Sequence, residues 1–313
     1  MLTPLRTPQE RFANLPDYPF AENYATVSHP DYDELRMHYV DVGPRSAPVV
    51  LMLHGEPSWS FGYRGVIAAV SAAGYRVVAP DHIGFGKSDK LLQVADYSYQ
   101  FFVDCMQTLV QQLELQKITL LCQDWGGPIG LRTLSQMPDR FSGLIVANTL
   151  LPNAQLPPLG IADWPGALVR NWAAAVSDMN DMPVASIVDG VCVTSLDEGV
   201  AAGYDAPFPD ASFKAAALAF PPLIPLSEAM PGIAENRMAW SVLEQLDIPC
   251  VTAFSDSDPS TKAWEVVFQS RLSKTAQHLS REIPGAGHFV QEDQPGLLAQ
   301  VVLDLQQFIA RSH

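Results

Sequence analysis

Short, uninterrupted apolar runs alternate with helical patterns along most of this chain, and this alternation constrains the fold more than any other feature. A strand that is apolar at every position is typical of a parallel sheet buried on both faces. Strand–helix alternation is typical of such a sheet with helices on both faces. The runs that predict strands are residues 49–53, 76–80, 118–122, 144–147, 250–254 and the less apolar 278–283.

Helical patterns fall between these runs, at residues 99–115 and 128–136, and a third closes the chain at 295–310. The closing segment places its apolar side chains on one face, as a helix that covers a sheet does. Residues 35–41 alternate between polar and apolar and predict an antiparallel edge strand. We therefore expect an α/β fold with a mostly parallel sheet of eight strands.

The strand pattern stops between residues 152 and 241, which are rich in proline and in short alanine-rich helical runs. This interruption predicts a helical cap inserted between two halves of the sheet. The core domain then comprises residues 1–151 and 242–313, and the cap domain residues 152–241. A chain of 313 residues is long enough for one large domain with such an insertion.

The composition of the chain limits the classes of ligand that it can bind. The net charge is -15, so the basic surface that nucleic acid requires is absent and a neutral substrate is the easier fit. No apolar stretch reaches about 18 residues, and the start has no signal core, so we expect no membrane span. The four cysteines form no C-x-x-C pair, which fits a reduced, cytoplasmic setting. We also expect a monomer.

Asp124 occupies the tip of a sequence built like a nucleophile elbow, which runs from a strand through Gln123-Asp124-Trp125-Gly126 into a helix. The familiar elbow carries serine. A serine that attacks an alkyl carbon leaves a stable ether, whereas a carboxylate leaves an ester that water cleaves. Asp124 therefore predicts displacement at an alkyl carbon followed by ester hydrolysis. Alone, a strand-end aspartate is also a common helix N-cap.

Two further titratable residues follow predicted strands, Asp258 after residues 250–254 and His288 after residues 278–283. Reactive groups of open α/β sheets gather beyond the carboxyl ends of the strands. The order nucleophile, acid, histidine is typical of α/β-hydrolases. Asp256 competes with Asp258 for the acid position, and we favour Asp258 because it lies further into the loop. Turn chemistry alone would also explain both aspartates.

Glu56 follows the first buried strand, in the turn His54-Gly55-Glu56-Pro57. Such a turn can aim the backbone N–H of Glu56 at the tip of the elbow. Together with the N–H of Trp125 it would form an oxyanion hole for ester hydrolysis. The same residues also fit a simple strand-to-helix turn.

Several of these motifs together resemble the first subfamily of the haloalkane dehalogenases. The resemblance runs nearly end to end and is loosest at residues 153–197. The motifs that carry it are His54-Gly55-Glu56-Pro57-Ser58-Trp59, Gly84-Phe85-Gly86-Lys87-Ser88-Asp89, Gln123-Asp124-Trp125-Gly126-Gly127, Tyr204-Asp205-Ala206-Pro207-Phe208-Pro209-Asp210 and Gly285-Ala286-Gly287-His288-Phe289-Val290-Gln291-Glu292.

The resemblance implies that two indole N–H groups bind the departing halide. Trp125 matches the first of them, and the second falls in the cap, where Trp164 and Trp172 compete. The family pattern of an aromatic residue three positions before the tryptophan favours Trp172, with Val169 in the aromatic place. An indole N–H donates without acting as a base. Ordinary core packing is the alternative role for either tryptophan.

The resemblance also implies the mechanism. Asp124 attacks a neutral haloalkane, His288 activates water against the resulting ester, and Asp258 orients His288. Alcohol, halide ion and a proton leave, and no metal or organic cofactor is expected. Some family members carry the acid after the strand before the cap, but here that strand ends in Asn148 and Thr149, which supports Asp258.

Three other functions compete. An epoxide hydrolase uses a similar aspartate with a pair of cap tyrosines, but Tyr204 is the only tyrosine in residues 152–241. A fluoroacetate dehalogenase places arginine near its nucleophile, which Trp125-Gly126-Gly127 does not. A ligand-binding protein on this fold usually loses a member of the triad, whereas this chain has every candidate.

Overall fold

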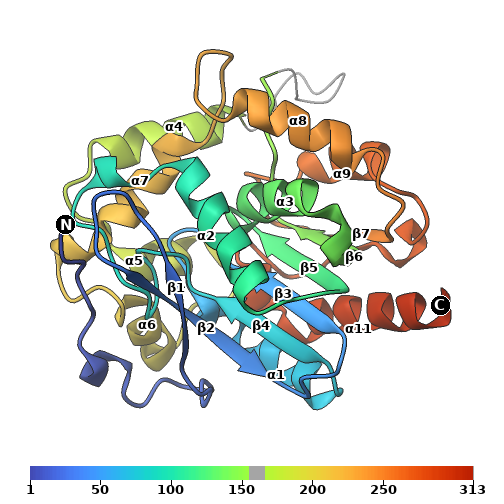
Figure 1. Cartoon of the computed structure of the whole chain (residues 1–313), viewed down its shortest axis with the longest axis horizontal. Coiled ribbons are helices and arrows are strands. Elements are labelled where there is room, and N and C mark those ends of the chain that lie inside the picture. The colour runs from blue at the N-terminus through green and yellow to red at the C-terminus, as the bar shows by residue number, and fades with distance from the viewer. Residues whose placement is uncertain (155–165, 313) are drawn as a thin grey trace.

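The computed structural model describes residues 1–154 and 166–312. Within them, eight strands form one sheet in the order β1-β2-β4-β3-β5-β6-β7-β8 (Figure 1). The strands are β1 Asn23–Val27, β2 Leu35–Val42, β3 Val49–Leu53, β4 Arg76–Pro80, β5 Ile118–Gln123, β6 Phe141–Ala147, β7 Cys250–Ser255 and β8 Arg281–Ile283.

The sheet is parallel from β4 across to β8, and β2 runs antiparallel to both of its neighbours, β1 and β4. Every residue of β3, β4, β5 and β7 is buried, which explains why their sequences are mostly apolar and lack alternation. The expected eight-stranded, mostly parallel fold is therefore confirmed.

Two predictions of strand position differ from the structure. The antiparallel strand expected at residues 35–41 exists as β2, but β1 lies outside it and forms the edge. β1 escaped prediction because it is short and only two of its five residues are buried. The strand expected at 278–283 covers only Arg281–Ile283, because Gln277–Leu279 forms a 3₁₀ turn.

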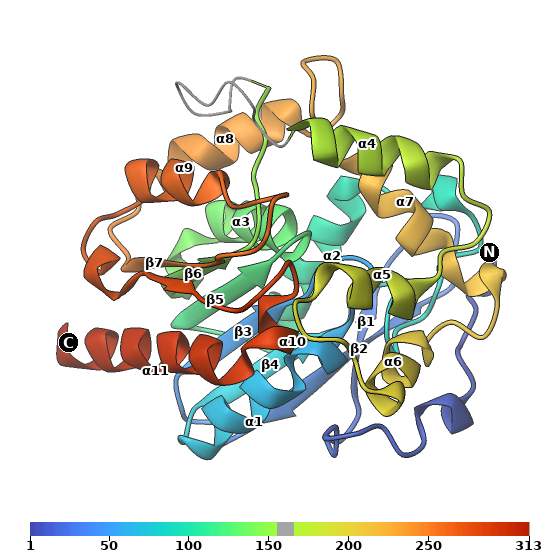
Figure 2. The same cartoon turned by 180° about the vertical axis from the view of Figure 1, so that it is seen from behind.

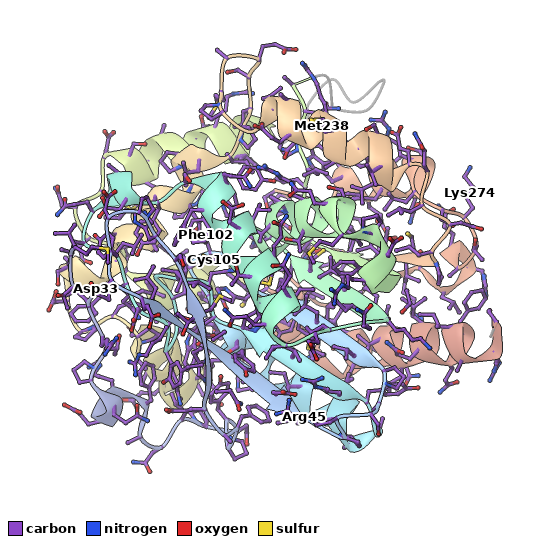
Figure 3. The ribbon with its side chains drawn as sticks, viewed as in Figure 1. Asp33, Arg45, Phe102, Cys105, Met238 and Lys274 are labelled. Atoms are coloured by element: carbon purple, nitrogen blue, oxygen red, sulfur yellow. The ribbon has the colours of Figure 1, made fainter. Side chains whose placement is uncertain are left out.

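Helices cover both faces of the sheet. α1 (Arg64–Ala72) and α11 (Pro295–Ser312) pack together on one face, and α2 (Tyr99–Gln112), α3 (Gly126–Gln136) and α9 (Trp264–Arg271) lie on the other (Figure 1). The side chains of Phe102 and Cys105 point from α2 into the interior, whereas Met238 reaches the surface (Figure 3). The helices expected at 99–115, 128–136 and 295–310 are thus present.

The described part of the segment between β6 and β7 contains five helices: α4 (Gly166–Ser177), α5 (Val184–Val191), α6 (Glu198–Asp205), α7 (Ala215–Leu223) and α8 (Ile233–Leu243). α4 packs against α7 and α5 against α6, while α8 packs against α3 beside the sheet (Figure 2). Trp164 lies outside the described residues. Among the described helices, none combines the length and apolar character that crossing a lipid bilayer requires.

Candidate active site

Asp124 stands at a sharp turn between β5 and α3. Its φ angle is +49°, a left-handed conformation that is uncommon for a residue with a side chain. Backbone strain of this kind is typical of functional turns. The turn leaves no room behind it, because a Cβ on Gly126 would lie 2.1 Å from the carbonyl oxygen of Leu53. Glycine is therefore required at this position of the elbow.

The turn after β3 approaches the Asp124 carboxylate from one side. The backbone N–H of Glu56 donates to Asp124 Oδ1 over 2.8 Å. A Cβ on Gly55 would lie 2.3 Å from Cβ of Asp124, so only glycine permits this approach. The turn expected to aim an N–H at the elbow does so.

His288 lies on the other side of the same carboxylate. Its Nε2 is 3.2 Å from Asp124 Oδ2, and its Nδ1 is 3.0 Å from Asp258 Oδ2. The structure thus brings Asp124, His288 and Asp258 into one chain of contacts. Asp256, the competing acid, is exposed and accepts from the backbone N–H groups of Gly285 and Ala286 instead.

Asp258 is only 2% exposed and is surrounded by donors. Ser260 donates to Oδ1 through its N–H at 2.9 Å and through its hydroxyl at 2.5 Å, and the hydroxyl of Thr261 donates to Oδ2. Burial alone would raise the pKa of this carboxyl, but His288, Ser260 and Thr261 outweigh it and hold the pKa well below the usual range. Asp258 is therefore ionised at neutral pH.

The two carboxylates act on His288 in the same way. Burial lowers the pKa of the imidazole, yet the charges and hydrogen bonds of Asp258 and Asp124 outweigh it and raise the pKa well above its ordinary value. The site thus favours the protonated form of His288, which lies between the side chains of Asp124 and Asp258. If Asp124 lost its charge, the pKa of His288 would fall, because one of its two anionic partners would be gone.

Replacing Thr261 with valine is expected to destabilise the fold by about 1–3 kcal/mol at neutral pH, because a buried carboxylate loses a donor. The stabilisation from a carboxyl with a depressed pKa is complete above the unfolded pKa and lost as the pH falls through the folded one. The difference in unfolding free energy between the wild type and Thr261→Val should therefore shrink only in strong acid, where Asp258 becomes protonated. Urea unfolding measures it, with Thr261→Ser as the control that retains the hydroxyl. Equal stability of all three proteins at neutral pH would contradict this role.

Two polar side chains that sequence reasoning missed hold the backbone next to His288. The amide of Asn148, just after β6, donates to the carbonyl oxygens of Gly287 at 2.9 Å and His288 at 3.0 Å. Gln123 donates to the same His288 oxygen at 3.0 Å. An asparagine or glutamine belongs to no recognisable sequence motif here. Only the position of Asn148 and Gln123 at strand ends could have indicated a role in the site.

A cavity of about 420 Å³ opens in front of Asp124. Trp125 forms one wall, where its ring stacks on Phe220 with centroids 4.7 Å apart. α4 contributes Val169 and the half-buried Trp172 to the lining. The lining is otherwise mostly apolar, with the side chains Leu150, Leu168, Ile187, Val191, Val193, Pro221, Ile224 and Phe289.

The side chain of Glu56 faces the same cavity. Burial, and then the negative charge of Asp124, raises the pKa of this carboxyl well above its usual value, while a hydrogen bond from Trp172 lowers it. Trp172 thus directs its indole N–H toward the side chain of Glu56. No cluster of metal-ligating side chains occurs in residues 1–154 and 166–312.

The chain is similar to known proteins along nearly its whole length. Residues 48–184 match the family described as the alpha/beta hydrolase fold. A haloalkane dehalogenase of Psychrobacter cryohalolentis is 44% identical over 97% of both chains, and one of Mycolicibacterium paratuberculosis is 42% identical over 97% of this chain and 98% of its own. The haloalkane dehalogenase of Paraglaciecola agarilytica, a tetramer, superposes with a TM-score of 0.85 at 33% identity, over 97% of both chains.

Proposed function

The chain belongs to the haloalkane dehalogenase family, and from this membership we propose that it hydrolyses haloalkanes through a covalent ester on Asp124. The observation that carries the proposal is the continuous contact from Asp124 through His288 to Asp258 at the end of an apolar cavity. A carboxylate at this place can displace a leaving group from an alkyl carbon and then be regenerated by water.

In the first step Asp124 attacks the halogen-bearing carbon. The N–H of Glu56 holds Oδ1, so Oδ2 is the oxygen we expect to attack. The halide departs toward the indole N–H groups of Trp125 and Trp172, which line the same cavity. An indole N–H can donate a hydrogen bond to the anion but cannot accept a proton as a base would. The carbon–halogen bond breaks as the carbon–oxygen bond forms, and its electron pair leaves with the halide.

In the second step water attacks the carboxyl carbon of the ester, the bond from that carbon to the alkoxy oxygen breaks, and the alcohol leaves as the Asp124 carboxylate is restored. Alkylation removes the charge of Asp124, so the pKa of His288 falls and the imidazole can lose its proton and act as general base. Asp258 keeps the ring oriented and stabilises the imidazolium that forms again. The oxyanion that develops on Oδ1 is within reach of the Glu56 N–H, and we assign the Trp125 N–H as its second donor.

Replacing Trp172 with phenylalanine is expected to weaken halide binding by about 10- to 100-fold, because an anion loses one charge-assisted hydrogen bond while the ring remains. Quenching of tryptophan fluorescence by bromide measures the affinity. The matched control is Trp164→Phe, which should leave the affinity nearly unchanged. If Trp164→Phe weakened bromide binding and Trp172→Phe did not, the assignment of the cap donor would be reversed.

Epoxide hydrolysis remains the alternative reaction for an aspartate at this turn. It requires tyrosine hydroxyls directed at the substrate. The hydroxyl of Tyr204 instead donates to Glu292 over 2.6 Å, outside the lining of the cavity. The purified protein should release halide from 1,2-dibromoethane and form no diol from styrene oxide. Diol formation without halide release would overturn the proposal.

The finer assignments rest on the same features. Glu56 beside Asp124, the acid after β7 and a cap tryptophan support membership of the first subfamily. We propose that residues 152–241 act as the cap, because α4, α5 and α7 supply much of the cavity wall. Val169 in that wall is expected to influence substrate preference. A monomer stays our prediction, and light scattering tests it against the tetramer of the Paraglaciecola relative.

A further inference from the structure

The loop that carries His288 is held from two sides. From the core, Asn148 and Gln123 bind its carbonyl oxygens. The N–H groups of the same loop bind two other partners, Val191 and Asp293. The N–H of His288 donates to the carbonyl oxygen of Val191 over 2.8 Å, and that of Gly287 donates to Asp293 Oδ2 over 2.8 Å. Val191 is the last residue of α5 and belongs to the proposed cap, whereas Asp293 belongs to α10 (Val290–Asp293).

Asp293 ends the short helix α10 (Val290–Asp293) and binds the same cap segment. Its Oδ2 also accepts from the N–H of Val193 over 2.9 Å, and its Oδ1 accepts from the N–H of Thr194 over 2.8 Å. One carboxylate therefore joins the catalytic loop to residues 191–194 through three backbone N–H groups. Figure 2 shows α10 next to the end of α5.

The two segments approach each other closely. A Cβ on Gly287 would lie 2.2 Å from the carbonyl oxygen of Val191, so any other residue would push the cap segment away. Val191 and Val193 line the cavity and are 41% and 54% exposed, which places them where the cavity meets solvent. This contact therefore sets both the position of the cavity wall and the surroundings of His288.

We infer that Asp293 is a positioning residue for the proposed hydrolysis, because its carboxylate fastens the cap segment 191–194 to the loop of His288. The inference rests on the proposed function in one respect, that His288 acts on the ester intermediate. Loss of the carboxylate removes the acceptor for the N–H of Gly287 and, at the same time, the acceptors for Val193 and Thr194 in the cap segment. His288 then loses its alignment toward water at Asp124, while the attack of Asp124 on the substrate carbon is little affected.

Asp189 offers a matched control. Its Oδ1 accepts from the N–H of Leu196 over 2.7 Å, so it holds the backbone just beyond segment 191–194, and this bond does not involve the His288 loop. Asp189→Asn and Asp293→Asn therefore make the same chemical change on two carboxylates whose partners, Thr194 and Leu196, lie two residues apart. Asp293→Ala, which removes all three acceptor bonds, serves as the stronger variant.

Hydrogen exchange followed by mass spectrometry tests the fastening without reference to catalysis. In Asp293→Asn we expect the amides of Gly287, Val193 and Thr194 to exchange about 10-fold faster or more, because local opening requires fewer bonds to break. In Asp189→Asn only the amide of Leu196 should accelerate. Exchange at Gly287 that is unchanged in both Asp293→Asn and Asp293→Ala would overturn the inference.

Single-turnover kinetics with 1,2-dibromoethane test the positioning. Asp293→Asn should form the alkyl-enzyme within about two-fold of the wild-type rate and hydrolyse it about 10-fold more slowly, because misplacing a catalytic group by a fraction of an ångström has effects of this size. Asp189→Asn should match the wild type in both steps. Faster exchange at Gly287 with a wild-type rate of ester hydrolysis would show a structural tie only and overturn the positioning role.

The two proposals fail in different ways. If the wild-type protein formed no alkyl-enzyme from 1,2-dibromoethane, the proposed function would fail, and the exchange experiment would still decide whether Asp293 joins the two segments. If the wild type turned over normally while Asp293→Asn and Asp189→Asn behaved alike in both measurements, the positioning role of Asp293 alone would fail.

Discussion

Replacing Asp124 with asparagine is expected to reduce halide release from 1,2-dibromoethane by at least about 10⁴-fold, the scale on which removal of a catalytic nucleophile acts. The neutral amide is a poor nucleophile and has no negative charge to displace a halide. The backbone should tolerate the change, because asparagine is among the residues that adopt a positive φ readily. Ion chromatography of released bromide measures the effect.

Two controls make this result decisive. Asp33→Asn makes the same change at an exposed loop position and should keep full activity. Mass spectrometry of the Asp124→Asn protein before and after the assay excludes deamidation back to aspartate. Full dehalogenation by intact Asp124→Asn protein would show that another group is the nucleophile.

Replacing His288 with phenylalanine is expected to stop the reaction after the first step. Asp124 can still attack, so about one halide per active site should appear, and steady turnover should then fall by about 10²- to 10⁴-fold, the usual contribution of a general base. The alkyl group should be found by mass spectrometry on the peptide that contains Asp124. Circular dichroism checks the fold, because removal of His288 leaves two carboxylates without their shared cation.

The wild-type pH dependence follows from the same pair of contacts. The general base works only when His288 is neutral, and Asp258 keeps the pKa of that histidine raised even after Asp124 is alkylated. Ester hydrolysis should therefore slow as the pH falls, while alkylation, which does not require the base, should be less sensitive to this titration. A His288→Phe ester whose decay depended on pH as the wild type does would contradict this assignment.

Several elements of the fold and the site could be predicted from the sequence because each depends on local pattern. The runs of β3, β4 and β5 are apolar at positions that are all buried, so pattern and structure agree. Asp124, Asp258 and His288 follow strands, and parallel strands bring their carboxyl ends to one edge. Chain order and strand position were therefore enough to predict which residues would meet.

Other parts of the fold and of the site could not be predicted from the sequence pattern. β1 depends on pairing with β2 rather than on its own composition, and its half-exposed residues give no continuous run. The donors around Asp258 are ordinary hydroxyl side chains, Ser260 and Thr261, whose role appears only when the loop is folded. Asp293 lies five residues after His288, and its link to residues 191–194 of the cap depends on tertiary packing.

The most direct test of the central claim, a covalent ester on Asp124, is turnover of a haloalkane in water enriched in a heavy oxygen isotope. If water attacks the carboxyl carbon of the ester, the heavy oxygen enters the Asp124 carboxylate, and mass spectrometry of the peptide containing Asp124 will show the added mass after many turnovers. If His288 instead directed water straight at the substrate carbon, the label would appear in the alcohol alone. An unlabelled Asp124 peptide after many turnovers would contradict the account.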